Sequence, residues 1–108
     1  MDSLFEKRHY PYALYLGHLA LEKILKSYYV KKIDKAAPYS HNLLYLAERC
    51  KLLLSENHKD LLEVVTRFNI EARYPDVKFR FYRTCTKKFT QKYIVEIKEF
   101  YKWLRKQI

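Results

Sequence analysis

Two short segments combine residue types that can bind an anion or move a proton. In the first, His41 and Asn42 stand where a helix is expected to begin. In the second, Arg73 and Asp76 flank a proline-fixed turn, and a guanidinium placed there can bind phosphate or carboxylate through paired N–H groups. Residue chemistry alone favours plainer roles. His41 would then only help to cap its helix, and Arg73 would pair with Asp76 or Glu71 to hold the turn.

A third candidate is the basic stretch from residue 77 to residue 92, which contains no acidic residue. Aromatic residues interleave with its cations, at Phe79, Phe81, Tyr82 and Phe89. Cations contact phosphates and aromatic faces stack on bases, so this mixture is typical of a nucleic-acid surface. The alternative is that the rings pack inward and the cations are simply solvated. The cations are Lys78, Arg80, Arg83, Lys87, Lys88 and Lys92.

We expect no metal and no cofactor. The four histidines lack the i, i+4 spacing or the cysteine partners that metal sites use. The single glycine, Gly17, excludes a glycine-rich phosphate loop. His18 borders the apolar face of a predicted helix and is expected to be a core or interface histidine.

The composition favours a small helical domain with an acidic partner. The chain has 108 residues, with one Gly and three Pro, too few for the many tight turns of an all-β domain. Its net charge of +10 favours RNA, DNA, an anionic nucleotide or an acidic protein as partner, with a solvated lysine surface as the alternative. Eleven Tyr, six Phe and one Trp are typical of interfaces, so we also expect oligomerisation.

The cysteines and the hydropathy pattern predict a cytoplasmic protein without a membrane segment. Cys50 and Cys85 are too few and too far apart for a disulfide scaffold, which favours free thiols in a reducing compartment. No apolar run approaches the roughly 20 residues that span a bilayer. The N-terminal segment, MDSLFEKRHY, lacks the apolar core of a signal peptide.

Apolar periodicity predicts one central helix with others packed around it. The central helix covers residues 12–32, with Leu16 and Leu19 forming a second apolar stripe, and Glu22 and Lys23 on its polar side. A short helical turn precedes it. Three further helices are predicted over residues 41–54, 58–72 (capped by Asn57) and 86–106. The segment between the last two alternates between apolar and charged residues and is predicted to be an extended loop.

Three motifs resemble those of the HEPN-domain proteins of bacteria and archaea. They are the segments at residues 20–26 (ALEKILK), 40–43 (SHNL) and 72–76 (ARYPD), in the family's order. The resemblance covers nearly the whole chain. It implies an all-α up-and-down bundle of four main helices, a homodimer, and pairing with a small nucleotidyltransferase in a toxin–antitoxin type system.

Two departures from the family pattern bear on activity and assembly. Family members that cut RNA carry an Arg followed by His after four to six residues, and no Arg in this chain has that spacing. We therefore predict a non-catalytic module. The family's first helix is also longer than residues 1–10 allow, so a partner subunit is expected to cover the second stripe of the central helix, at Leu16 and Leu19.

The sequence thus predicts a HEPN-like module that binds a nucleotide, RNA or a nucleotidyltransferase. The first alternative is a divergent ribonuclease in which Arg73 holds the phosphate and His41 is the acid/base. The second alternative is a purely structural dimeric interaction module. The predicted ligand-binding residues are His41, Asn42, Arg73, Asp76, Lys78, Arg80, Arg83, Lys87 and Lys88.

Overall fold

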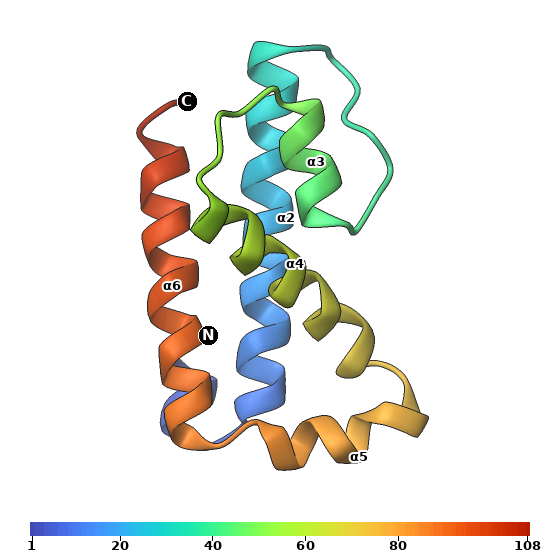
Figure 1. The fold of residues 1–108 in the computed structure, drawn as a ribbon, viewed down its shortest axis with the longest axis vertical. Coiled ribbons are helices and arrows are strands. Elements are labelled where there is room, and N and C mark those ends of the chain that lie inside the picture. Colours follow the sequence, from blue (N-terminus) through green and yellow to red (C-terminus); the bar gives the residue numbers. More distant parts are fainter.

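Five helices pack around one long central helix in the computed structural model of the chain (Figure 1). The structure describes the backbone of residues 1–108 and all side chains except those of residues 75–78. No strand occurs in this described backbone, so the predicted all-α bundle is confirmed. The helices are α1 (Asp2–Glu6), α2 (Tyr10–Lys32), α3 (Leu43–Arg49), α4 (Glu56–Glu71), α5 (Pro75–Thr84) and α6 (Lys87–Arg105).

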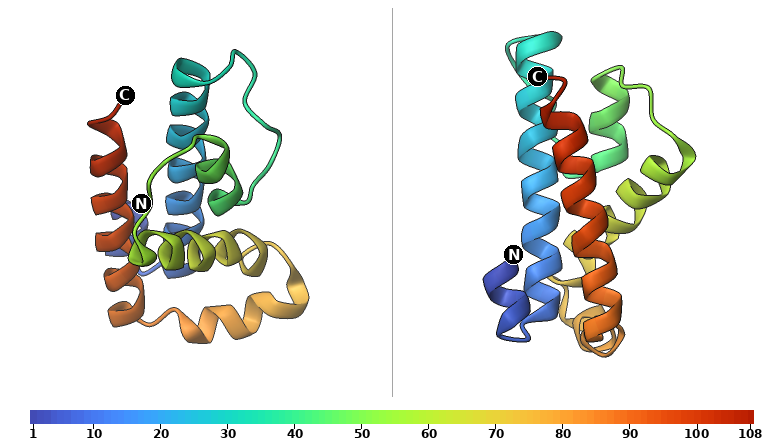
Figure 2. Two further views of the ribbon diagram at one scale, coloured as in Figure 1. Left: turned by 45° about the horizontal axis from the view of Figure 1, so that its top comes forward. Right: turned by 90° about the vertical axis from the view of Figure 1, so that its left-hand side faces the viewer.

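Helix α2 is the central element, and every other helix contacts it. It begins two residues earlier than predicted, and Pro11 lies in its first turn, where a missing N–H costs nothing. It ends with Lys31 and Lys32, whose charges complement the negative end of the helix dipole. Helix α6 lies beside α2 and runs in the same direction, while α4 crosses them obliquely and α5 lies across their lower end (Figures 1 and 2).

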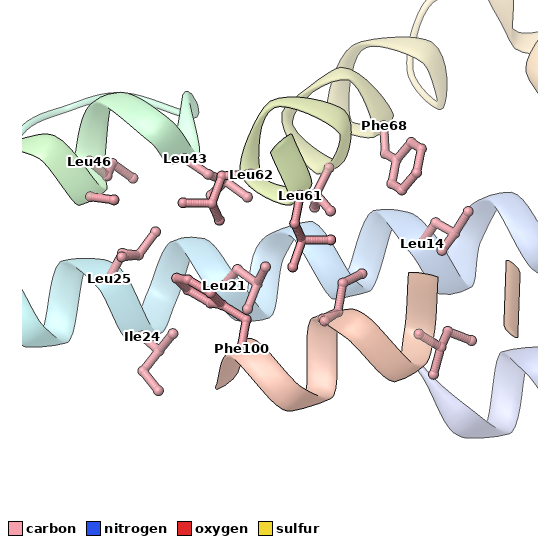
Figure 3. Packing of buried hydrophobic residues seen from close by; sticks show 14 of the residues in the cluster. Leu14, Leu21, Ile24, Leu25, Leu43, Leu46, Leu61, Leu62, Phe68 and Phe100 are labelled. Atoms are coloured by element: carbon pink, nitrogen blue, oxygen red, sulfur yellow. The ribbon is translucent and has the colours of Figure 1, made fainter. Parts of the chain in front are cut away.

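The core forms where leucines of α2 meet the other helices. Leu14, Leu21 and Leu25 are fully buried, and they face apolar side chains of α3, α4 and α6 (Figure 3). Gly17 lets α6 approach closely, because a Cβ at this position would lie only 2.8 Å from Ile97 Cδ1. The predicted apolar face of the central helix is therefore the core face.

Side-chain caps set the beginnings of three helices. Asn42, Ser55 and Thr86 each accept a hydrogen bond from the backbone N–H three residues later, at the start of α3, α4 and α6 respectively. The predicted cap at Asn57 is therefore wrong, and α4 begins two residues earlier than expected.

Helix α3 is shorter than its apolar pattern predicts. Lys51 adopts a left-handed conformation (φ 58°), and the N–H of Leu52 bonds the carbonyl of Ala47 at 3.3 Å. This arrangement closes the helix after Arg49. The apolar residues beyond it continue the pattern without continuing the helix, and Leu53 is 94% exposed.

Helix α5 corrects the predicted extended loop. The alternation of KFRFYR imitates a strand, but Phe81 and Cys85, four residues apart, are the side chains that the fold buries. That spacing belongs to one face of a helix. Pro75 at the start of α5 fits a first helical turn, so the same proline that separates α5 from α4 also begins the new helix.

Candidate functional site

His18 and Glu22 of α2 both bond to His41, in the segment before α3. The Nε2–H of His18 donates to the backbone carbonyl of His41 at 2.8 Å. One helical turn later, Glu22 Oε1 accepts from the Nδ1–H of the His41 ring, also at 2.8 Å. His18 and Glu22 are four residues apart and therefore lie on one line along the helix. The backbone and the side chain of His41 are thus both fixed from α2.

Glu22 is a buried carboxylate whose two oxygens both have partners. Its second oxygen, Oε2, accepts from Lys26 Nζ at 3.0 Å. Burial raises the pKa of Glu22, but the hydrogen bonds from His41 and Lys26 outweigh it, so the pKa lies below its ordinary value. The prediction that Glu22 sits on the polar side of the helix is wrong, since Glu22 is only 8% exposed.

His18 is a fully buried imidazole, as predicted for a core histidine. Burial lowers its pKa. The hydrogen bond to the His41 carbonyl and the Glu22 carboxylate oppose this shift, and the charges of His41 and Arg73 add to it. Since Nε2 carries the proton, Nδ1 is left as an acceptor, and it has no partner among the described residues.

Arg73 reaches the same region from the end of α4. Its Nη1 donates to Asn69 Oδ1 at 3.4 Å, and Asn69 is buried. No ion pair joins Arg73 to Glu71 in the described part of the chain, so pairing with Glu71 does not hold the turn there. The side chain of Asp76, the other expected partner, lies outside the described residues. The Arg73 guanidinium is exposed and keeps most of its donors for a ligand.

We name these six residues the His41 cluster: His18, Glu22, Lys26, His41, Asn69 and Arg73. Both residues that the sequence selects act on His18, since the His41 carbonyl accepts its hydrogen bond and the charge of Arg73 contributes to the lowering of its pKa. Asn42, also selected, is the cap of α3, because its Oδ1 accepts from Tyr45 N at 3.1 Å. The sequence places Asn69 just before the Arg73 turn but does not assign it a ligand-binding role, and it assigns Lys26 to no site. The sequence pattern that could have identified both residues is the i, i+4 spacing of Glu22 to Lys26 and of Asn69 to Arg73.

The predicted basic stretch lies on α5 and the first turns of α6. Arg80, Arg83, Lys87 and Lys88 are exposed there, and the side chain of Lys78 lies outside the described residues. The aromatic side chains divide: Phe81 is 2% exposed, whereas Phe79 and Tyr82 are each 67% exposed. Phe89 is partly buried and packs against the core, with its ring centre 6.0 Å from that of Phe68. The structure therefore combines the two alternatives, with two rings turned inward and two outward.

The described residues provide few other reactive groups. They contain no group of three or more His, Cys, Asp or Glu side chains that could hold a metal ion. Cys50 and Cys85 are free and buried, and burial raises their thiol pKa values to about 11 and about 12, which keeps both protonated. None of the helices in the described chain is long and apolar enough to cross a bilayer.

The geometry of the His41 cluster supports two kinds of chemistry. Because Glu22 accepts the Nδ1 proton, the neutral His41 ring presents Nε2 as its basic nitrogen, and the His41 side chain is 45% exposed. The exposed guanidinium of Arg73 can bind an oxyanion. The cluster thus offers a donor for an anion at Arg73 and a basic nitrogen at His41, which could accept a proton from a hydroxyl.

Burial of His18 predicts that acid destabilises the fold. The folded state holds His18 neutral, with a pKa below the ordinary 6.5, whereas the unfolded chain takes up a proton near that value. The free energy of unfolding should therefore fall as the pH drops from 7 to 5, by at most about 1.4 kcal/mol per pH unit for this group. Urea unfolding at several pH values measures the slope.

A glutamine at position 18 can still donate to the His41 carbonyl but cannot titrate. His18→Gln should therefore flatten the slope, leaving the part due to His58, whose pKa is also lowered by burial. The control His9→Gln changes an exposed imidazole and should leave the slope unchanged. An equally steep slope in His18→Gln and in the native protein would contradict the assignment.

The comparison with protein families agrees with the motifs that form this cluster. The model of the HEPN domain matches residues 1–107. Neither a curated protein nor a solved structure matches the chain. The match spans all six helices, including the three segments that supply Glu22, His41 and Arg73. The chain belongs to the HEPN domain family.

Proposed function

We propose that this chain is a non-catalytic HEPN module that binds a nucleotide or RNA through the His41 cluster. The observation that carries the proposal is the partly exposed ring of His41, which Glu22 orients while the buried His18 holds the backbone of the same residue. Asp76 and Lys78, whose side chains lie outside the described residues, remain predicted contributors. Arg80, Arg83, Lys87 and Lys88 would supply further phosphate contacts.

The charges around the cluster favour an anionic ligand. The carboxylate of Glu22 lies in the cluster, and Lys26 and His41 occupy both of its oxygens. Its negative charge is therefore largely compensated, and it does not repel a phosphate strongly. The outward-facing groups are the exposed guanidinium of Arg73 and the half-exposed ring of His41. A charge-assisted hydrogen bond from Arg73 is worth about 1.5–3 kcal/mol.

Loss of Arg73 should weaken binding of ATP and of labelled RNA by about tenfold or more, because one charge-assisted contact is removed. Isothermal titration of Arg73→Ala with ATP and fluorescence anisotropy with RNA measure the two affinities. The matched control is Arg49→Ala, which removes an exposed arginine at the end of α3. If Arg73→Ala and Arg49→Ala bind equally well, the His41 cluster is not the binding site.

A divergent ribonuclease is the second candidate, and the contact between Glu22 and His41 favours it. A carboxylate that orients an imidazole and leaves its other nitrogen available is the arrangement of an acid/base catalyst. Arg73 would hold the scissile phosphate. The absence of the family's Arg-to-His spacing argues for the non-catalytic function, because His41 here precedes Arg73 and lies in a different segment.

Incubation with mixed RNA separates these two functions. The non-catalytic proposal predicts intact RNA with the native protein on a denaturing gel. Cleavage that is lost in His41→Ala and retained in His9→Ala would instead identify a ribonuclease that uses His41.

A groove between α2 and α6 supports the predicted homodimer. It has a volume of about 750 Å³, and Leu16, Leu19 and Ala20 form part of its wall. Leu16 is 39% exposed and belongs to the second apolar stripe identified in the sequence. Covering this stripe by a second copy would remove apolar surface from water. Family membership also supports a nucleotidyltransferase as a protein partner, within a toxin–antitoxin type system.

A charge in this groove should dissociate the dimer. Leu16→Glu would place a carboxylate in the interface, and light scattering should then report a monomer where the native protein is a dimer. Leu53→Glu, at a 94% exposed position in the loop after α3, is the matched control and should remain a dimer. A monomeric native protein would rule out the homodimer. A dimer that binds neither ATP nor RNA would instead indicate a purely structural module.

A further inference from the structure

Helix α5 exposes two aromatic rings on one face. Phe79 and Tyr82 are each 67% exposed, and Arg83 lies beside them with its guanidinium carbon 4.8 Å from the centre of the Phe79 ring. The spacing of these three residues, i, i+3 and i+4, places them together on the helix surface. Two large rings side by side at such exposure form an apolar patch, and exposed apolar patches mark interaction surfaces.

The opposite face of α5 fixes the orientation of these rings. Phe81 is buried, and its ring centre lies 5.4 Å from that of Phe68 on α4. Cys85, one turn later, is also buried. With Phe81 and Cys85 held in the core, α5 cannot rotate to bury Phe79 and Tyr82. The helix is therefore anchored with its aromatic face outward.

The surroundings of the two rings are cationic. Between residues 79 and 92 the chain has no acidic residue. The described cations of this segment are Arg80, Arg83, Lys87, Lys88 and Lys92, all of them exposed. Helix α6 begins three residues after α5 ends, so the cations of its first turn follow closely along the chain.

We propose that the α5 platform, formed by Phe79, Tyr82 and Arg83, stacks unpaired bases of single-stranded RNA. This inference rests on the proposed function and names the form of its RNA ligand. Exposed aromatic rings among cations are the arrangement that single-strand binders use, because rings stack on bases while cations follow the phosphates. A base-paired helix hides the faces of its bases, so the platform selects the unpaired strand.

The charge decides between RNA and an apolar protein surface as occupant. A protein partner for Phe79 and Tyr82 would have to bring an acidic rim to match the cations of this segment. A polynucleotide satisfies both requirements along its whole length, since each unit carries a base and a phosphate. The α5 platform is therefore assigned to a strand of RNA, and the protein partner becomes an outcome of the test.

Fluorescence anisotropy with a labelled, unstructured RNA of about 10 nucleotides tests the proposal. Phe79→Ala and Tyr82→Ala should each weaken binding about tenfold, while binding to a duplex of the same sequence changes little. Phe79→Trp, which keeps a stacking ring, should restore the affinity. The control Tyr45→Ala removes a ring that is 44% exposed on α3 and should bind normally. Lys87→Ala combined with Lys88→Ala should make binding less dependent on salt.

The outcomes separate the platform from the His41 cluster. If RNA binding survives in Phe79→Ala and Tyr82→Ala but ATP binding is lost in Arg73→Ala, the platform is overturned and the proposed function stands. If the two ring variants lose RNA while Arg73→Ala keeps both ligands, the platform stands and the His41 cluster does not bind. Equal affinity for single-stranded DNA, or for an acidic peptide that also requires Phe79 and Tyr82, would overturn the assignment to RNA.

Discussion

The two hydrogen bonds to the buried carboxylate of Glu22 are the interactions on which the packing of the segment before α3 depends. A carboxylate taken out of water is costly unless its oxygens are bonded, and here one oxygen accepts from His41 and the other from Lys26. The same requirement fixes the segment before α3, because Glu22 holds the ring of His41 while His18, one turn earlier, holds its carbonyl. Removing His41 would leave a buried charge with only one partner, at a cost of about 1–3 kcal/mol or more. The residue proposed to bind the ligand is therefore also a partner that the fold requires.

Local rules predicted most of the fold. The leucine spacing of α2 and the regular apolar stripes of α4 and α6 predict these helices, because a helix that buries one face repeats its apolar residues every three or four positions. The same rule failed where apolar residues are not buried. Leu53 continues the stripe of α3 but lies in solvent, and the end of that helix is set by the left-handed Lys51, which no apolar pattern records. In α5 the apolar period hides the helix, because three aromatic rings lie within four residues and only Phe81 faces inward.

The candidate site was predictable residue by residue but not as a cluster. His41 and Arg73 stand out by type and by their place beside helix ends. Glu22 was assigned to the solvent side because it is charged. Its burial depends on His41, which comes from a segment 19 positions further along the chain. Such a contact depends on the path of the connector between α2 and α3, which the sequence does not encode locally. The ion pair between Glu22 and Lys26 can be predicted from the sequence, because residues four positions apart are neighbours on a helix surface. Lys23, the next residue, is exposed.

Helix α4 connects the two ligand-binding surfaces proposed for this chain. Phe68, near its end, packs against Phe81 of α5 and against Phe89 and Tyr93 of α6, and so holds the α5 platform. The next residue, Asn69, accepts from Arg73 and so helps to position the guanidinium of the His41 cluster. Because consecutive residues of one helical turn support both surfaces, a shift of this turn would displace Arg73 and the rings of α5 together. One RNA strand contacting both surfaces would therefore bind to a single rigid support, and the entropy of ordering them is already spent in folding the core.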